Sequence, residues 1–251
     1  KDLSFKTTIG YQRYLYDNYN YSSSQYGNAA NVGGRVTQNR DITTSINITN
    51  VLNYKKQFGN HTIGIDAIHE AYKYKLDQMY AQGEGFLAGI EVNDGATVPA
   101  GVGGSISEER LTSYLGRASY NYANKYFVEG SFRTDGSSRF GPGNRWGNFF
   151  SVGGAWSIKD ESFLVDSKVV STLKLKGSYG ELGNNRGIGY FPYIQAYNTG
   201  WNNLDQTGVL LGGVVDPNLT WEKTSSLNAG ADLGFLNNRI QATVEYYEKK
   251  S

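Results

Sequence analysis

The sequence predicts an all-β protein: an antiparallel segment of a transmembrane β-barrel with about nine strands. Apolar and polar residues alternate with period 2, several alternating segments run for about ten to fifteen residues, and short and long connections follow one another. Globular strands are mostly about five to six residues long, whereas a tilted strand needs about nine to eleven to cross the hydrocarbon of a bilayer. Long alternating strands with unequal connections therefore favour a membrane barrel.

The alternation is clearest in five segments of the chain. Successive side chains of a strand point to opposite faces, so each segment predicts a strand with one apolar face. The five segments are 3–11, 46–54, 150–158, 227–235 and 240–246, while 62–77 and 111–122 alternate less regularly. In the fourth segment we expect Leu227, Ala229, Ala231, Leu233 and Phe235 to face lipid, and Asn228, Gly230 and Asp232 to face the lumen.

The expected connections alternate between tight turns and long loops. Tight turns are expected at 58–61, 123–125 and 236–238, and a medium connection at 159–171 lies on the same side. Membrane barrels have short periplasmic turns and longer extracellular loops. Proline cannot donate to a strand ladder, and all four prolines fall in expected loops. The long-loop side comprises 17–40, 78–108, 132–150 and 182–218, with Pro99, Pro142, Pro192 and Pro217.

Aromatic rings cluster near the expected strand ends. Tyr122 and Tyr126 flank the turn at 123–125, and Trp146 and Phe150 follow the segment that begins at 132. Bilayer interfaces favour amphipathic rings at both ends of an apolar band. Membrane lipid is therefore the expected partner of the apolar face, and ordinary cross-strand packing of the rings is the alternative.

Composition excludes several classes of function. The formal net charge is +1, so nothing favours binding to nucleic acid. The chain has no cysteine, which excludes disulfides, thiolate metal sites and cysteine nucleophiles. Its two histidines, His61 and His69, cannot form a histidine-rich metal site or a credible Ser-His-Asp set. We therefore expect no catalytic residue, no metal and no cofactor.

The segment FRTDGSSRFGPGNRWGNFF, at 132–150, is expected to form the tip of a structured hairpin. Asp135-Gly136 and the Gly-Pro-Gly at 141–143 are typical turn residues. Asp135 is expected to accept hydrogen bonds from Arg139 or Arg145, which would fix the loop, and Trp146 is expected to restart the strand. The segment lacks phosphate-loop spacing, and direct contact with a ligand is the alternative.

Three stretches carry a resemblance to a known family. They are YFVEGSFRTDGSSRFGPGNRWGNFFSVGGAWSI at 126–158, LKLKGSYGELGNN at 173–185 and NLTWEKTSSLNAGADLGFLNNRIQATVEYYEKK at 218–250. Together they resemble the barrel of SusC/RagA-type TonB-dependent outer-membrane transporters of Bacteroidetes-like bacteria, over roughly residues 110–251. One departure is that Asn148, Phe149 and Phe150 stand where the family often has Tyr-Phe-Pro after Arg-Trp-Gly.

The resemblance implies import across the bacterial outer membrane without covalent chemistry. It also implies a barrel of about 22 strands closed by a plug, a SusD-like surface lipoprotein as lid, TonB as the energy source, and an oligosaccharide or a peptide as cargo. Residues 1–251 are then expected to be an incomplete barrel domain, with no plug and no signal peptide among them. A passive porin or structural barrel, and a soluble β-rich protein that binds glycans, are the alternatives.

The segment 182–218 is the expected cargo loop. Sugars present apolar C–H faces beside hydroxyl groups, so exposed rings flanked by amides and charges would suit them. We expect Trp201 and Tyr197 to contact cargo, with Asn202, Asn203 and Arg186 beside them. In the alternative interpretation, these rings pack against neighbouring loops or against the lid lipoprotein.

Overall fold

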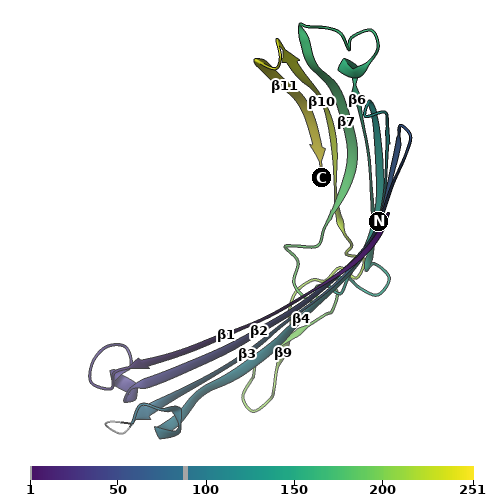
Figure 1. The fold of residues 1–251 in the computed structure, drawn as a ribbon. Helices are drawn as coiled ribbons and strands as arrows, with labels where there is room; N and C mark the ends of the chain where they lie inside the picture. Colours follow the sequence, from purple (N-terminus) through teal and green to yellow (C-terminus); the bar gives the residue numbers. More distant parts are fainter. Residues whose placement is uncertain (1, 87–89) are drawn as a thin grey trace. The chain divides into compact units, whose positions relative to one another are not determined.

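The computed structural model describes residues 2–86 and 90–251, in which nine strands form one sheet (Figure 1). The sheet has the order β1-β2-β3-β4-β5-β6-β7-β10-β11, and β8 pairs with β9 in a separate two-stranded ribbon. The open sheet of nine strands confirms the predicted fold class. The strands are β1 Leu3–Ser22, β2 Arg35–Phe58, β3 His61–Phe86, β4 Ala96–Tyr122, β5 Tyr126–Ser137, β6 Trp146–Ser157, β7 Val170–Asn184, β8 Tyr197–Thr199, β9 Val209–Leu211, β10 Glu222–Phe235 and β11 Ile240–Lys250.

Helical structure in the described ranges is limited to three short 3-10 turns. They are η1 Ala30–Val32, η2 Asn93–Gly95 and η3 Ile158–Asp160. Across residues 2–86 and 90–251, no helix has the length and apolar character needed to cross a membrane.

The chain divides into two compact units. Unit 1 holds 2–8, 48–71 and 111–251, and unit 2 holds 9–47, 72–86 and 90–110. Most of unit 2 is strand, so the expected loops at 17–40 and 78–108 are wrong over much of their length. The 96–106 portion of β4 does alternate, with Val98, Val102 and Ile106 on one face. The portions at 17–22 and 35–40 carry polar residues on both faces and therefore lack an apolar period. Cross-strand ion pairs join them instead, with Arg35 Nε 2.7 Å from Glu84 Oε1 and Arg40 Nη2 2.8 Å from Asp17 Oδ2.

Pro99 lies within β4, so the expectation that every proline falls in a loop is wrong there. β5 pairs with β4 only from Leu111 to Tyr122. At Pro99, the side of β4 that faces β5 is therefore unpaired. A proline is tolerated at such an edge because no hydrogen bond from its backbone nitrogen is needed there. The other three prolines lie outside the strands, as predicted.

In unit 1, the strand register sorts side chains onto two faces. Directly opposed residues of antiparallel strands share a face, so Val128 shares one with Gly154 and Ala229, and Glu129 shares the other with Gly153 and Asn228. We call the first the apolar face and the second the polar face. The predicted alternation is confirmed. The apolar face carries Leu227, Ala229, Ala231, Leu233 and Phe235, and the polar face carries Asn228, Gly230 and Asp232.

Tight turns join β2 to β3, β4 to β5 and β10 to β11, at the three predicted places. The 123–125 and 236–238 turns contain non-glycine residues with positive φ, including Asn124 at 56° and Asn237 at 58°. Asparagine tolerates this left-handed conformation better than most residues. β5 and β6 continue into the segment 132–150, leaving only 138–145 as the loop, and Trp146 begins β6 as predicted.

Candidate functional site

Three buried aromatic side chains form a small core at the loop ends of β6 and β10. Phe140 and Phe149 lie against the indole of Trp221, with ring centroids 5.2 Å and 5.7 Å away. Trp221 Nε1 donates to the Arg145 carbonyl oxygen at 2.9 Å. Gly183 makes room for this core, because a Cβ there would lie 2.1 Å from the Phe149 ring. We call Phe140, Phe149 and Trp221 the loop-base cluster.

The segment 185–221 is fixed at both of its ends to Ser137 or to the 138–145 loop that follows it. At its start, Asn185 Nδ2 donates to Ser137 Oγ at 3.0 Å, and Arg139 Nη1 donates to the Ile188 carbonyl oxygen at 2.6 Å. At its end, Asn144 Nδ2 donates to the Pro217 carbonyl oxygen at 3.2 Å. The two loops therefore form one packed base from which the middle of 185–221 extends.

Asp135 and Gly136 lie inside β5, so their expected role as turn residues is wrong. The buried Asp135 carboxylate accepts from Arg133 Nε, at 2.8 Å and 2.9 Å, rather than from Arg139 or Arg145. Two positions along a strand bring Arg133 and Asp135 to the same face. Arg133 also donates to Glu70 Oε2 at 3.0 Å, so it joins β5 to β3.

Two other residues of the 132–150 motif also have roles that differ from the expectation. Arg145 Nε donates to the Phe140 carbonyl oxygen at 3.3 Å. Gly136 opposes Trp146 across the strand pair, and a Cβ at Gly136 would lie 3.0 Å from the indole ring. Gly136 therefore provides space for Trp146, a requirement of packing across two strands that turn propensity does not reveal.

Four of the five expected cargo residues lie in β8 or in the connection between β8 and β9. Tyr197 opposes Leu211, and Trp201 follows β8; the two rings are 60% and 61% exposed. Asn203 forms a bridge with Gln206, and Asn202 Oδ1 accepts from the Gly208 N–H at 3.4 Å. Arg186 lies ahead of the ribbon, where its backbone N–H donates to Asn184 Oδ1 at 2.9 Å.

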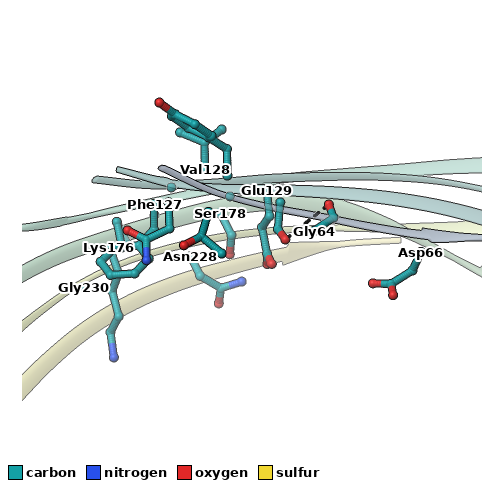
Figure 2. Close-up of a pocket in the computed structure, with 18 of the residues that line it drawn as sticks. Gly64, Asp66, Phe127, Val128, Glu129, Lys176, Ser178, Asn228 and Gly230 are labelled. Atoms are coloured by element: carbon teal, nitrogen blue, oxygen red, sulfur yellow. Dashed lines mark hydrogen bonds between the residues drawn. The ribbon is translucent and has the colours of Figure 1, made fainter. Parts of the chain in front are cut away.

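A hollow of about 640 Å³ lies on the polar face of unit 1 (Figure 2). Figure 2 shows Val128 on the opposite side of the sheet from Lys176 and Asn228, which line the hollow. Lys176 Nζ is 2.6 Å from Glu245 Oε1 and 3.2 Å from Asp232 Oδ1. Small residues at other lining positions, including Ser178, Gly153 and Gly230, leave the space open.

The hollow offers hydrogen-bonding groups and paired charges. Over residues 2–86 and 90–251, no three histidine, aspartate or glutamate side chains are grouped so that they could hold a metal ion. The hollow was not predicted from the sequence, because its lining comes from strands that are far apart in the chain. The signal available was the small and polar residues at polar-face positions, such as Ser178, Asn228 and Gly230.

Sequence relatives of this chain are TonB-dependent receptors. TonB-dependent receptor P3 of Formosa agariphila is 31% identical over 262 residues, which cover 99% of this chain and 25% of that protein. TonB-dependent receptor SusC of Bacteroides thetaiotaomicron is 39% identical over 150 residues, which cover 56% of this chain and 15% of that protein. TonB-dependent receptors P3 and P39 match nearly the whole of this chain, and the chain spans about a quarter of the length of each.

A solved structure and a protein family agree with these relatives. The structure of the RagAB peptide transporter matches 99% of this chain and 28% of that chain, with a TM-score of 0.88 and 26% identity. The family described as "TonB dependent receptor-like, beta-barrel" matches residues 1–251. Members of this family are outer-membrane receptors and transporters, not enzymes. The chain belongs to the TonB-dependent receptor β-barrel family and is similar to its SusC and RagA types.

Proposed function

We propose that this chain forms part of the barrel wall of an outer-membrane importer. The apolar face of unit 1 contacts lipid, and the polar face lines the lumen. The importer takes up oligosaccharides or peptides together with a SusD-like surface lipoprotein. Energy comes from TonB, acting through a plug that these residues do not include. Family membership supports this proposal, as do the relative named SusC and the RagAB structure, which is described as a peptide transporter.

The observation that carries the proposal is an apolar band between two aromatic rows. At the loop side, Tyr114 stacks with Trp146 at a centroid distance of 6.4 Å. At the turn side, Tyr126 stacks with Tyr122 at 6.3 Å and with Trp156 at 6.2 Å. Exposed apolar side chains occupy the face between these rows, among them Val128, Phe132, Phe150 and Val152.

The height of this band matches a bilayer. Trp146 and Trp156 lie ten positions apart on β6, which is roughly 33 Å at about 3.3 Å per residue. A strand tilt of about 40° reduces this to roughly 25 Å, the height of the apolar band of outer-membrane barrels. Aromatic rings at both edges are typical of membrane interfaces. This arrangement supports lipid contact over water contact for the exposed apolar side chains.

The test of import uses the full-length protein in its own outer membrane. Cells with and without the gene take up labelled oligosaccharides and labelled oligopeptides, each with and without a protonophore. We expect uptake of one cargo class to require both the gene and the proton gradient. A passive porin would maintain gene-dependent uptake after the gradient is collapsed. A soluble glycan-binding protein would be recovered without detergent.

We also propose that the β8–β9 ribbon contacts the cargo through Trp201 and Tyr197, with Asn202, Asn203 and Arg186 as polar neighbours. The high exposure of both rings above the packed base supports this role. In purified complexes of barrel and lid lipoprotein, Trp201→Ala with Tyr197→Ala should weaken cargo binding about tenfold or more, since aromatic side chains dominate such contacts. The thermal stability of the barrel should be unchanged.

The matched control is Asn198→Ala, because Asn198 lies on β8 with its side chain on the opposite face from that of Tyr197. Cargo binding should tolerate this change. Unchanged cargo binding in the double variant would place the cargo site elsewhere. A joint loss of stability and lid association would mean that the rings serve packing.

A further inference from the structure

The connection between β6 and β7 is held by the Lys159 side chain and by backbone hydrogen bonds to Glu161. Lys159 Nζ donates to the carbonyl oxygens of Leu164, Val165 and Ser167, at 3.0, 2.7 and 3.2 Å. The Glu161 carbonyl oxygen accepts from the N–H groups of Leu164 and Val165, at 2.9 and 2.8 Å. Residues 158–169, which we call the rim loop, are therefore held by many internal hydrogen bonds.

Glu161 ties the rim loop to the apolar face of unit 1. Its Oε1 accepts from Trp156 Nε1 at 3.0 Å and from the Tyr126 hydroxyl, and its Oε2 lies 3.3 Å from Lys125 Nζ. Tyr126 and Trp156 belong to the turn-side aromatic row on the apolar face. The loop therefore joins the sheet where the apolar band ends.

The rim loop exposes apolar side chains although its backbone is fixed. Phe163 is 72% exposed and Val165 is 50% exposed, and the exposed Asp166 and Lys168 follow them. Nearby, Val169 and Leu236 are also exposed, and the Leu236 N–H donates to the Val169 carbonyl oxygen at 2.9 Å. An exposed apolar group beside an apolar band is typical of a surface that another phase or molecule covers.

We infer that Phe163 and Val165 insert into the phospholipid leaflet beside the turn-side aromatic row and anchor this rim of the barrel. The inference rests on the proposed function, since it requires the apolar band to lie in a bilayer. Lipid is the occupant that the contacts favour, because Glu161, two positions before Phe163, accepts hydrogen bonds from Tyr126 and Trp156 at the edge of the apolar band. Phenylalanine at the boundary of an apolar band gains from burial among acyl chains.

The test places an environment-sensitive probe at single positions of the full-length protein. The chain contains no cysteine, so Phe163→Cys gives a labelling site for the fluorophore NBD that is unique within it, once any cysteines elsewhere in the protein are replaced. The protein is reconstituted into vesicles of phosphatidylethanolamine and phosphatidylglycerol, with or without brominated acyl chains. Iodide in the buffer serves as the aqueous quencher.

We expect the label at Phe163→Cys to emit at shorter wavelength and to lose at least half its intensity with brominated lipid. Asp166→Cys, in the same loop, is the control: its label should respond to iodide and not to brominated lipid. If iodide quenches both labels alike, the inference is wrong. It is equally wrong if neither quencher reaches position 163, because the side chain is then buried in protein.

A second control separates this inference from the proposed function. This control is Val128→Cys, because Val128 lies on the apolar face between the two aromatic rows. If brominated lipid quenches a label at position 128 but not at position 163, only the rim-loop anchor is refuted. If it quenches neither label, the placement of the apolar face in lipid fails as well.

Discussion

Two adjacent phenylalanines on β6 show how differently the two faces of the sheet are covered. Phe149, on the polar face, is 3% exposed because it packs against Trp221 in the loop-base cluster, whereas Phe150, on the apolar face, is 46% exposed. The residue type and the strand are the same, so the difference in exposure comes from what covers each face. On the polar face, the protein's own loops bury the ring. On the apolar face, the proposed cover is lipid.

The largest expected effect is the difference in unfolding free energy between Phe149→Ala and Phe150→Ala. Phe149 sits between the Trp221 indole and Gly183, so its removal leaves a cavity and should cost about 3–5 kcal/mol of unfolding free energy. Phe150→Ala removes only part of a lipid-facing surface and should cost much less. Denaturant unfolding of the full-length protein in phospholipid vesicles measures both. Similar costs would show that the faces are not covered differently.

The second test sharpens the assignment of the faces in β10. Leu227 is in register with Tyr179 and Val152, near the middle of the apolar band, whereas Ala231 is level with Trp156 at its edge. An arginine at Leu227 should therefore cost about 2–4 kcal/mol, while Asn228→Arg, toward the hollow, should be mild. Unfolding in vesicles compares the two variants. If Asn228→Arg is as costly as Leu227→Arg, the polar face does not border a water-filled lumen.

The smallest effect concerns the rim loop and pH. Hydrogen bonds from Tyr126 and Trp156, and then the contact with Lys125, hold the pKa of Glu161 below its ordinary value of 4.5. A carboxyl whose pKa is lowered by folding stabilises the folded state above its ordinary pKa, and this contribution disappears as the pH falls through the lowered value. Glu161→Gln should therefore be less stable than the parent at neutral pH, with the difference shrinking toward acid.

Unfolding midpoints of the parent and Glu161→Gln between about pH 3 and about pH 7 measure this dependence. Asp166→Asn removes an exposed carboxylate from the same loop and should not reproduce it. A constant difference between the parent and Glu161→Gln at every pH would mean that the charge of Glu161 contributes nothing.

Sequence alternation predicts the structure well where one face is apolar and the other is polar. β10, β11 and β6 from Phe150 onward were predicted in this way, and the tight turns followed from the gaps between alternating segments. In unit 2, β1 continues past Tyr16 and β2 begins before Arg40, and these portions were not predicted because both of their faces are polar. Backbone ladders and ion pairs such as Arg40–Asp17 hold those strands, and neither leaves an apolar period in the sequence.

Roles within the candidate site were harder to predict than the strands. Trp146 at the start of β6 was predicted from its place after a turn-rich segment. The partner of Asp135 was not, because Arg133, Arg139 and Arg145 are chemically equivalent in sequence and only the strand faces distinguish them. Gly136 and Gly183 leave space for the rings of Trp146 and Phe149, and a single sequence does not show which residues lie opposite each other in the sheet.

Because both ends of the 185–221 segment are held, the length and sequence of its middle can change at little cost to stability. Contacts near Asn185 and Trp221 hold both ends of the segment against one support. Once the ends are held, each doubling in the length of a flexible loop costs only about 0.6 kcal/mol. Insertions, deletions and wholesale replacement between these ends are therefore cheap, and the position can acquire new recognition surfaces while the strands below it keep their sequence.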